Sequence, residues 1–316
     1  MKTNTLYAGD CLDRMREWAD DCVNLIYLDP PFNSKANYNI LFGKGKDKSR
    51  KDDLAQMTAF KDTWQWDADA EERVNKISKA IDHPAHYAIK GFDALFRQSG
   101  NGMLAYLSYM AERLAEMRRL LKPTGSIYLH CDPTASHYLK IVMDEIFGRK
   151  NFRNEIAWCY KGPANAKHHF PRKHDYVLFY GKSRAAQFHS NAVRVPYSDS
   201  FLQRRRHTEG ESGITAGYAD GRTDKEVENK FGKGKVIEDY WTDIPSGGQV
   251  SNKERLGYPT QKPLALLERI IAASSNADDI VLDPFCGCGT TIHAAHNLKR
   301  KWMGIDISYY ATLLSH

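Results

Sequence analysis

The sequence lacks the features that mark several other classes of protein. No stretch approaches the roughly 18 apolar residues that a membrane-spanning helix needs, and the first residues lack the apolar core of a signal peptide. The six cysteines are scattered, and no Cys or His pair with zinc-ligand spacing accompanies Cys286-x-Cys288. We therefore expect a cytoplasmic protein with reduced cysteines and no metal site.

The composition is that of an ordinary globular protein with a modest excess of basic residues. Of 316 residues, 42% are hydrophobic and 27% are charged, and the net charge is +6. Basic side chains crowd three segments, residues 44–51, 161–174 and 204–206. One such segment is more typical of a solvated loop, but three of them outside the apolar runs favour a nucleic-acid partner.

Apolar runs alternate with amphipathic helical patterns, which predicts an α/β protein. Two stretches break this alternation, residues 35–100, with Trp64 and Trp66, and the glycine-rich and basic residues 185–258. We interpret both as long irregular insertions on the α/β core. Strands are predicted at about residues 6–8, 23–28, 126–130, 155–160, 175–180, 280–282 and 302–305, and helices at about 12–18, 104–121, 137–147, 264–273 and from 290.

A glycine-containing turn follows the predicted strand at residues 280–282. The strand runs into Asp283-Pro284-Phe285-Cys286-Gly287-Cys288-Gly289, and a helix is predicted to begin at Thr290 and Thr291. Glycine lets a ligand approach the backbone closely, and the N–H groups at a helix N-terminus can hold a carboxylate. This arrangement predicts a site for a nucleotide-like cofactor.

Two further features narrow the choice of cofactor. Asp306 ends the next predicted strand, where an acidic side chain can bind two ribose hydroxyls. The dinucleotide pattern G-x-G-x-x-G is absent, because Thr290, Thr291 and Ile292 follow Gly289, and this disfavours NAD or FAD. On this motif alone, a tight turn that binds no ligand stays open as an alternative.

The Asp29-Pro30-Pro31-Phe32 segment, after the predicted strand at 23–28, is more specific. Each proline fixes its own φ and keeps the residue before it out of the helical region, so Asp29 and Pro30 are held extended. The carboxylate of Asp29 and the carbonyl of Pro30 can then accept two hydrogen bonds from one NH₂ group, beside the flat ring of Phe32. The alternative is a capped strand end with an exposed turn.

Such a pair of acceptors suits the transfer of a methyl group to the exocyclic amine of adenine or cytosine. This amine is a poor nucleophile, because its lone pair is delocalised into the ring. Two acceptors can draw the nitrogen toward tetrahedral geometry, so that it attacks a sulfonium methyl group in line. Orientation would supply much of the rate, and the acceptors would stabilise the charge that develops on nitrogen.

Together the motifs resemble those of the amino-directed (N6-adenine/N4-cytosine) S-adenosylmethionine-dependent DNA methyltransferases, and specifically their circularly permuted β group, in which the catalytic motif precedes the cofactor motif. Leu28-Asp29-Pro30-Pro31-Phe32-Asn33 is similar to the catalytic motif, and residues 282–291 are similar to the cofactor loop. Tyr258-Pro259-Thr260-Gln261-Lys262-Pro263 is similar to the segment before the cofactor strand. The cysteines at 286 and 288 depart from the usual small residue and serine.

The resemblance implies a role for each matching residue. The Asp29-Pro30-Pro31-Phe32 segment would form the catalytic amine clamp, Asp10 would reach the cofactor's adenine, and Gln261 and Lys262 would lie near its methionine carboxylate. The full set implied to bind S-adenosyl-L-methionine is Asp10, Asp29, Gln261, Lys262, Asp283, Phe285, Gly287, Gly289, Thr290, Thr291 and Asp306.

The resemblance also implies the fold, which is a Rossmann-like class I methyltransferase. This is an α/β architecture with a seven-stranded, mostly parallel sheet and helices on both faces. Residues 1–184 would form the catalytic half, with a DNA-proximal insertion at 35–100. Residues 185–258 would form the target-recognition region, and residues 259–316 the cofactor-binding half of the same core. The strand that would follow Asp306 in such a sheet is expected at Leu6–Asp10.

The implied partner is double-stranded DNA, with the target base flipped out of the duplex. Tyr38, Trp64, Trp66 and Trp241 are candidates to stack on that base, with ordinary packing as the alternative. By family analogy we expect a homodimer associated with the nucleoid. Whether a cognate restriction endonuclease belongs to the same system is left open.

Several alternatives stay open at this stage. Adenine N6 is favoured over cytosine N4, because Asp rather than Ser begins the clamp. An RNA adenine methyltransferase is disfavoured by the motif order and by the long recognition insertion. The intact motifs argue against an inactive DNA-binding partner, and the absent third glycine argues against a nucleotide-dependent oxidoreductase.

Overall fold

The computed structural model describes residues 1–31, 36–41, 56–62, 64–98, 102–162, 166–205, 224–246 and 261–307. The chain divides into two compact units, one of Met1–Phe188 with Asp239–His316 and one of His189–Glu238. Within the described ranges, none of the helices is long and apolar enough to cross a membrane.

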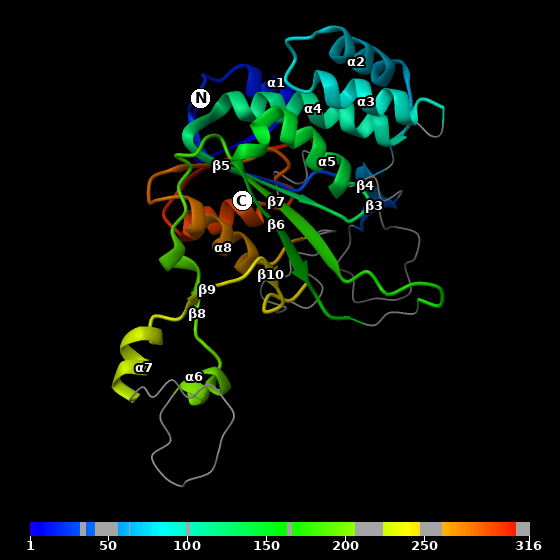
Figure 1. Ribbon diagram of the computed structural model, residues 1–316. Coiled ribbons are helices and arrows are strands. Elements are labelled where there is room, and N and C mark those ends of the chain that lie inside the picture. The colour runs from blue at the N-terminus through cyan, green and yellow to red at the C-terminus, as the bar shows by residue number, and fades with distance from the viewer. Residues whose placement is uncertain are drawn as a thin grey trace, which may run out of the picture. The chain divides into compact units, whose positions relative to one another are not determined.

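The first unit is built on an eight-stranded sheet with the strand order β1-β12-β11-β2-β5-β7-β6-β10 (Figure 1). Neighbouring strands are parallel, except that β7 is antiparallel to both β5 and β6. The prediction of an α/β fold with a mostly parallel sheet is confirmed. The strands are β1 (Thr5–Ala8), β2 (Val23–Leu28), β5 (Leu121–Cys131), β6 (Phe152–Cys159), β7 (His174–Gly181), β10 (Tyr240–Trp241), β11 (Ile280–Asp283) and β12 (Lys301–Asp306).

All seven strands predicted from the sequence belong to this sheet. The eighth, β10, is only two residues long and pairs Tyr240 with Ala157 and Trp241 with Trp158 of β6. The predicted count of seven therefore misses this edge strand. Two residues carry no alternating pattern, so β10 leaves no signal in the sequence.

Helices cover both faces of the sheet (Figure 1). On one face, α4 (Gly102–Leu120) packs against α1 (Cys11–Arg16) and α5 (Ser136–Met143), and α5 continues into a π-helical turn at Asp144–Gly148 and a 3-10 turn at Arg149–Asn151. On the other face, α8 (Leu264–Ser274) packs against α9 (Thr290–Asn297). This arrangement buries the central strands almost completely, as their near-continuous apolar sequence requires.

Two helices that the sequence pattern missed lie within residues 64–98. They are α2 (Ala68–Lys79) and α3 (His86–Phe96), and both pack against α4. Val74, Ile77 and Ile89 are fully buried on their inner faces. The expectation of an irregular insertion at 35–100 is therefore wrong for this part. In α2, a few apolar residues at helical spacing suffice once a neighbouring helix covers them, whereas α3 is mostly apolar.

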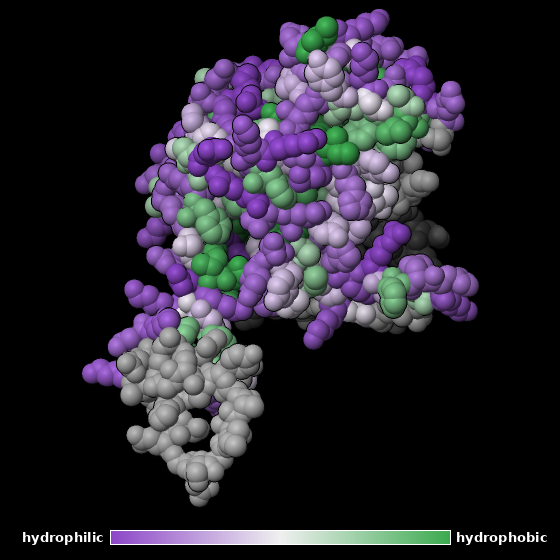
Figure 2. Space-filling model, in the orientation of Figure 1, coloured by the Kyte–Doolittle hydropathy of each residue, from purple (hydrophilic) through white to green (hydrophobic). Residues whose placement is uncertain are grey.

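The remainder of this stretch contains a separate two-stranded antiparallel sheet of β3 (Ala36–Leu41) and β4 (Gln56–Asp62). On the face shown in Figure 2, hydrophilic residues dominate, and apolar colour gathers over α3. Tyr87 and Leu95 of this helix are 69% and 67% exposed. Single exposed apolar side chains of this kind are common on soluble proteins.

The carboxyl ends of four parallel strands meet at one edge of the sheet. Ala8 at the end of β1 pairs with Asp306 at the end of β12, and Asp283 ends the adjacent strand β11. On the other side of β11, Leu282 pairs with Ile26 of β2. Ligands of open parallel sheets bind beyond these carboxyl ends. The segments that follow the four strands are thus brought together from opposite ends of the sequence.

The second unit, His189–Glu238, lies inside the stretch predicted to read the target, residues 185–258. Tyr197 stacks on Phe201 at 4.6 Å between ring centroids, and the ring of Phe231 meets both edge-on. These rings form a small core of its own. Its elements are a 3-10 turn (Ser190–Val193), β8 (Arg194–Val195), α6 (Asp199–Arg205), α7 (Asp224–Phe231) and β9 (Lys235–Val236), with β8 and β9 antiparallel.

Candidate active site

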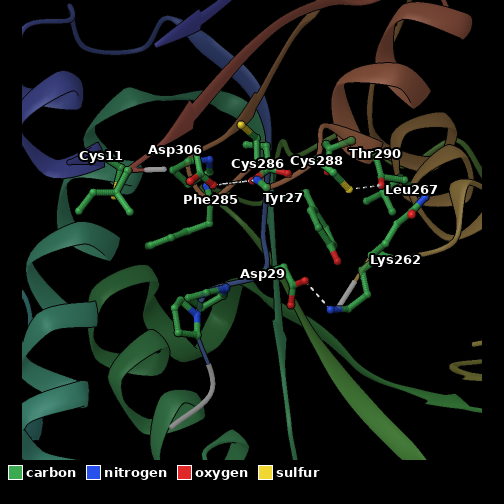
Figure 3. A pocket seen from close by; sticks show the side chains of 18 of the residues that line it. Cys11, Tyr27, Asp29, Lys262, Leu267, Phe285, Cys286, Cys288, Thr290 and Asp306 are labelled. Atoms are coloured by element: carbon green, nitrogen blue, oxygen red, sulfur yellow. Dashed lines mark hydrogen bonds and ion pairs between the residues drawn. The ribbon is translucent and has the colours of Figure 1, made fainter. Parts of the chain in front are cut away.

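A cavity opens at the carboxyl edge of the sheet, among the segments that follow β1, β2, β11 and β12 and the segment that precedes α8 (Figure 3). The structure therefore brings the two predicted motifs into one site. Among the residues predicted for catalysis and cofactor binding, those that line the cavity are Asp10, Asp29, Pro30, Pro31, Gln261, Lys262, Asp283, Phe285, Gly287, Thr290, Thr291 and Asp306.

Asp29 directly follows β2 and is held by the two prolines after it. One carboxylate oxygen, Oδ2, forms an ion pair with the ammonium of Lys262, 233 positions away in the sequence. The other oxygen, Oδ1, is buried and accepts no hydrogen bond from the residues that the structure describes. A buried acceptor without a donor is costly. Oδ1 is therefore suited to accept a hydrogen bond from a ligand in the cavity.

The turn after β11 is shaped by glycine and tied to β12. Gly287 and Gly289 have φ values of +48° and +85°, a region that side chains with a Cβ rarely adopt. The N–H of Gly287 donates to Oδ2 of Asp306 at 2.8 Å, and the N–H of Cys286 donates to the carbonyl of Ile305 at 3.0 Å. The first turn of α9 follows, with its N–H groups at the cavity wall.

Asp283, at the end of β11, is 3% exposed. Burial raises the pKa of its carboxyl from 3.8 to about 7, and the charge of Asp29 adds to this rise. The hydrogen bonds donated by the Thr291 hydroxyl and the Phe285 N–H act in the opposite direction. A cation beside Asp283 would favour the ionised carboxylate. The residue therefore suits a positively charged ligand group.

Asp10 caps α1 and is fixed on both carboxylate oxygens. Oδ1 accepts the N–H of Leu12 at 2.7 Å, and Oδ2 accepts Nη2 of Arg113 at 2.5 Å. The guanidinium of Arg113 is buried and lies 3.2 Å from the ring centre of Tyr109, which also lines the cavity. Asp10 is thus a rigid wall of the cavity, and each of its oxygens has room for a further donor.

The charge of the cavity indicates the kind of ligand that it suits. Its lining from the described residues carries four carboxyl groups, those of Asp10, Asp29, Asp283 and Asp306, and one ammonium, that of Lys262. Such an excess of acidic groups favours a small molecule with positive charge. S-adenosylmethionine carries a sulfonium and an ammonium against one carboxylate, so the residues present fit this cofactor.

Sequence reasoning missed several residues of this site. Tyr27, Cys11, Tyr109 and Leu267 line the cavity, and Arg113 lies directly behind it. Tyr27 falls within a predicted strand and Tyr109 within a predicted helix, where an aromatic residue is typical of ordinary core packing. Only the tertiary arrangement turns them toward a ligand.

Other predicted residues have different positions. Phe32 lies outside the described residues, and Gly289 caps α9 with its left-handed backbone but does not line the cavity. Trp64 packs against Tyr106 and Tyr109, with ring centroids 5.5 and 4.5 Å apart.

Two further tryptophans proposed as stacking helpers also pack within the protein. Trp66 is partly buried against the core, and Trp241 is 5% exposed beneath Arg269. Only the backbone of Tyr38 is described. For the tryptophans, the alternative of ordinary packing is the one that the structure favours.

One of the three basic segments is largely described. Residues 160–173 join β6 to β7 at the same edge of the sheet as the cavity. In this loop Lys167, His168 and Arg172 are exposed, and Phe170 is 95% exposed. Residues 44–51 and the side chains of Arg204–Arg206 lie outside the described part of the chain.

Comparison with known proteins identifies the family. The DNA methylase family model, N6_N4_Mtase, matches residues 23–314. The chain therefore belongs to this family of DNA methylases, as its two motifs predicted.

Individual relatives agree with this assignment. The Type II methyltransferase M.EcaI of Enterobacter cloacae is 32% identical over 252 residues, which cover 66% of this chain and 56% of that protein. The DNA adenine methyltransferase YhdJ of Escherichia coli (strain K12) is 26% identical over 309 residues, 97% of this chain and 79% of that protein. The chain spans about half the length of several curated relatives that it matches, including 54% of M.BamHI.

Solved structures share the fold. The cytosine-N4-specific PvuII DNA methyltransferase has a TM-score of 0.57 at 13% identity, over 99% of this chain and 86% of that one. The complex of M1.HpyAVI with S-adenosylmethionine has a TM-score of 0.51 at 17% identity, over 98% and 96% of the two chains. The predicted class I methyltransferase fold is confirmed.

Proposed function

We propose that this protein is an S-adenosylmethionine-dependent DNA methyltransferase that methylates N6 of a flipped-out adenine. The observation that carries the proposal is the buried Oδ1 of Asp29, an acceptor without a donor among the described residues, in a cavity shared with the glycine turn. The family membership and the names of relatives, which include DNA adenine and Type II methyltransferases, support it.

S-adenosylmethionine supplies, when bound, a methyl group that a nucleophile can displace from its sulfonium centre. In this cavity Asp283 would hold the ammonium of the cofactor, and the N–H groups at the start of α9 would suit its carboxylate. Asp306 steadies the glycine turn through Gly287 and would bind the ribose hydroxyls. Asp10, fixed by Arg113, would bind near the adenine.

Asp29 acts on the target amine. Its Oδ1 and the carbonyl of Pro30 accept the two N–H bonds of the exocyclic NH₂ group, which turns the lone pair of the nitrogen toward the methyl donor. Lys262 holds Oδ2, so that the carboxylate cannot rotate away from the amine. The positive charge that develops on the nitrogen is stabilised by Asp29, whose Oδ1 is buried.

We propose adenine as the target because Asp, a charged acceptor, begins the clamp, and a relative is named a DNA adenine methyltransferase. Cytosine N4 is the second candidate, since the same two acceptors could hold its amine.

The remaining assignments follow from the resemblance. We propose that the chain belongs to the circularly permuted β group, since the Asp29 motif precedes the Asp283 motif in the sequence. Double-stranded DNA is the substrate, and residues 185–258, which include the second unit, read the target. A homodimer, a cognate endonuclease and association with the nucleoid belong to the same proposal.

The test is a transfer assay with the full chain, S-adenosylmethionine labelled in its methyl group, and genomic DNA digested afterwards to nucleosides. We expect the label in N6-methyldeoxyadenosine. Label in N4-methyldeoxycytidine would select the second candidate. Label in RNA alone, or in neither nucleic acid, would overturn the proposal.

A further inference from the structure

A second polar group lies behind the wall of the cavity, and the amine clamp does not account for it. The hydroxyl of Tyr27, a residue that lines the cavity, lies 2.9 Å from Nδ1 of His130. Nε2 of His130 lies 3.2 Å from Oδ2 of Asp175. Tyr27 belongs to β2, His130 to β5 and Asp175 to β7, so three neighbouring strands supply a hydroxyl, an imidazole and a carboxylate in series.

These contacts fix the direction in which protons are donated. The carboxylate of Asp175 accepts Nε2–H of His130, which leaves Nδ1 as an acceptor for the Tyr27 hydroxyl. Burial raises the pKa of Asp175, but its contacts with His130, Lys262 and Tyr160 outweigh this effect, and the net pKa is lowered. The phenol of Tyr27 thus points its proton at His130. The lone pairs of the Tyr27 oxygen can then accept a hydrogen bond from a ligand in the cavity.

The position of the Tyr27 oxygen relates the series to Asp29. Figure 3 shows the Tyr27 side chain pointing toward the pair formed by Asp29 and Lys262. Tyr27 itself is 1% exposed and His130 is fully buried, with the ring of Trp158 edge-on at 5.6 Å. Bulk water therefore does not reach these groups readily, and a proton released beside Asp29 needs a defined acceptor.

Other charged and titratable groups surround the series. Burial and the charges of Asp29 after β2 and of Asp283 on β11 act on the Tyr27 hydroxyl and raise its pKa, and the hydroxyl of Tyr160 donates to Oδ1 of Asp175 at 3.3 Å. Lys262, before α8, and Asp132, after β5, also act on this part of the site through their charges. Among the described groups around the series, the negative charges outnumber the one ammonium.

We propose that Tyr27 accepts the proton released by the target amine and passes its own proton to His130, with Asp175 as the residue that orients and stabilises the imidazolium. This inference rests on the proposed methyl transfer to an exocyclic amine. Tyr27 is then a catalytic residue, and His130 and Asp175 are positioning residues that act through it.

The proton balance of the step is complete. When the amine nitrogen has formed its bond to the methyl carbon, it carries one proton too many. One of its two N–H bonds leaves its acceptor in the clamp and breaks toward the oxygen of Tyr27, while the O–H bond of Tyr27 breaks toward Nδ1 of His130. The proton resides on His130 beside the carboxylate of Asp175, and it returns through Tyr27 to water once the product has left. No oxidant or further reactant is needed.

Asp29 is less suited to keep this proton itself. Its Oδ2 is occupied by the ammonium of Lys262, and its Oδ1 holds the amine in the clamp. Asp29 can stabilise the developing positive charge, while the imidazole–carboxylate pair behind Tyr27 provides the place for the proton. In enzymes with a hydroxyl, an imidazole and a carboxylate in series, the hydroxyl gives its proton to the imidazole, and the carboxylate orients the imidazole and stabilises its charged form.

The first experiment measures the single-turnover rate of methyl transfer by the full chain. Tyr27→Phe removes only the hydroxyl, and we expect the rate to fall by roughly 10²-fold, the size of a general-base contribution. The dissociation constant for S-adenosylmethionine should change less than about threefold, which corresponds to less than about 1 kcal/mol. The matched control is Tyr128→Phe, since Tyr128 is equally buried but bonds to Ser274 at 2.6 Å, away from the cavity.

The second experiment uses the pH dependence of the same rate. In wild type, the rate should rise with pH to a plateau, because the series can accept the proton of the amine only when it carries no extra proton. Asp175→Asn removes the carboxylate that stabilises the imidazolium, so the acid limb should move to lower pH and the plateau should fall. His130→Gln should remove this limb, while His86→Gln, at a buried histidine bonded to the carbonyl of Ile77, should leave it in place.

A third measurement does not depend on activity. In ¹⁵N NMR of the free protein, with His130 assigned from His130→Gln, the ring should carry its proton on Nε2, and Tyr27→Phe should shift only the Nδ1 signal strongly. A proton on Nδ1 would overturn the proposed route, because His130 would then donate to Tyr27. If wild type transfers methyl groups and Tyr27→Phe does so at the same rate and pH dependence, this inference fails. Absence of transfer by wild type would instead refute the proposed function.

Discussion

At the scale of single residues, Asp29 is the side chain on which kcat should depend most. Asp29→Ala removes the buried acceptor Oδ1 and releases Lys262 from its ion pair. We expect kcat to fall by about 10²–10³-fold, as when one donor or acceptor is removed from a developing charge. Affinity for S-adenosylmethionine, measured by calorimetry, should fall by less than about tenfold, since several other residues hold the cofactor.

The control for this prediction is Asp21→Ala. Asp21 is half-exposed and forms an ion pair with Lys182 at the surface. Its removal should leave both kcat and affinity close to wild type. An equal loss of affinity and turnover in Asp29→Ala would contradict a mainly catalytic role for this carboxylate.

The raised pKa of Asp283 predicts that cofactor binding depends on pH. Burial raises its pKa to about 7, so below that pH the free protein holds a proton that the cofactor's ammonium must displace. By linkage, Kd for S-adenosylmethionine should rise by up to about tenfold per unit as the pH falls below about 7. Asp283→Asn should bind more weakly and with a flat profile, measured by calorimetry in buffers between about pH 5.5 and 7.5. A slope that persists in the variant would exclude Asp283 as its source.

The same shift affects the stability of the free protein. Because the pKa of Asp283 is raised in the fold from 3.8 to about 7, the folded chain keeps a proton that the unfolded chain has lost in this range. Stability therefore falls as the pH rises through this window, and the loss is complete above pH 7. Bound S-adenosylmethionine should offset the loss, since its ammonium stabilises the ionised form.

The sequence predicts site residues well where the backbone demands a particular residue type. Asp29 before two prolines and Gly287 with positive φ belong to this group, because few residue types can take those positions. Tyr27 and His130 belong to the other group. The pattern predicts that both lie in strands, but their hydrogen bond joins positions 103 apart and follows only from the order of the strands in the sheet.

At the scale of elements, the loop between β6 and β7 is a candidate contact for DNA. It lies at the edge of the sheet that holds the cavity, and its exposed residues include Lys167, Phe170 and Arg172. Cationic side chains around one exposed ring suit phosphate contact together with insertion of the ring between bases.

This arrangement predicts separable effects. Lys167→Ala with Arg172→Ala should weaken DNA binding and lower its salt dependence by about one to two units of slope. Phe170→Ala should leave that slope unchanged and reduce the fluorescence of 2-aminopurine placed at the target base. Binding isotherms at several salt concentrations measure the first effect. Wild-type fluorescence with Phe170→Ala would exclude a role for the ring in base extrusion.

The elements themselves were predictable where a pattern extends over several residues. The seven longer strands of the sheet and α4 follow from runs of apolar residues that a packed sheet or helix face needs. Helix α2 was missed because few of its residues are apolar, and α4 supplies the cover that makes those few sufficient. Helix α3 is mostly apolar, and it was missed because the long stretch around it is polar and basic. Helix propensity and apolar spacing are properties of the local sequence, whereas the packing surface that α4 provides comes from another part of the chain.

At the scale of the whole molecule, the division into two units predicts a division of tasks. Residues 190–237 can be replaced by a flexible Gly/Ser linker, because the second unit has its own aromatic core and the cavity belongs wholly to the first. We expect the shortened protein to bind S-adenosylmethionine with nearly wild-type affinity and to lose sequence-selective methylation. Calorimetry and sequencing-based mapping of methylated sites measure the two properties. Retention of the wild-type target sequence would contradict the assignment of recognition to this unit.

The pairing of β1 with β12 and of β2 with β11 has a consequence for biosynthesis. Residues near the start of the sequence, such as Thr5 and Leu25, find their strand partners in Met303 and Val281. While the chain is on the ribosome, its early strands must wait until the residues of β11 and β12 have emerged. A nascent fragment that ends before Asp283 lacks one wall of the cavity, so the site cannot be complete until β11 and the turn after it have been synthesised.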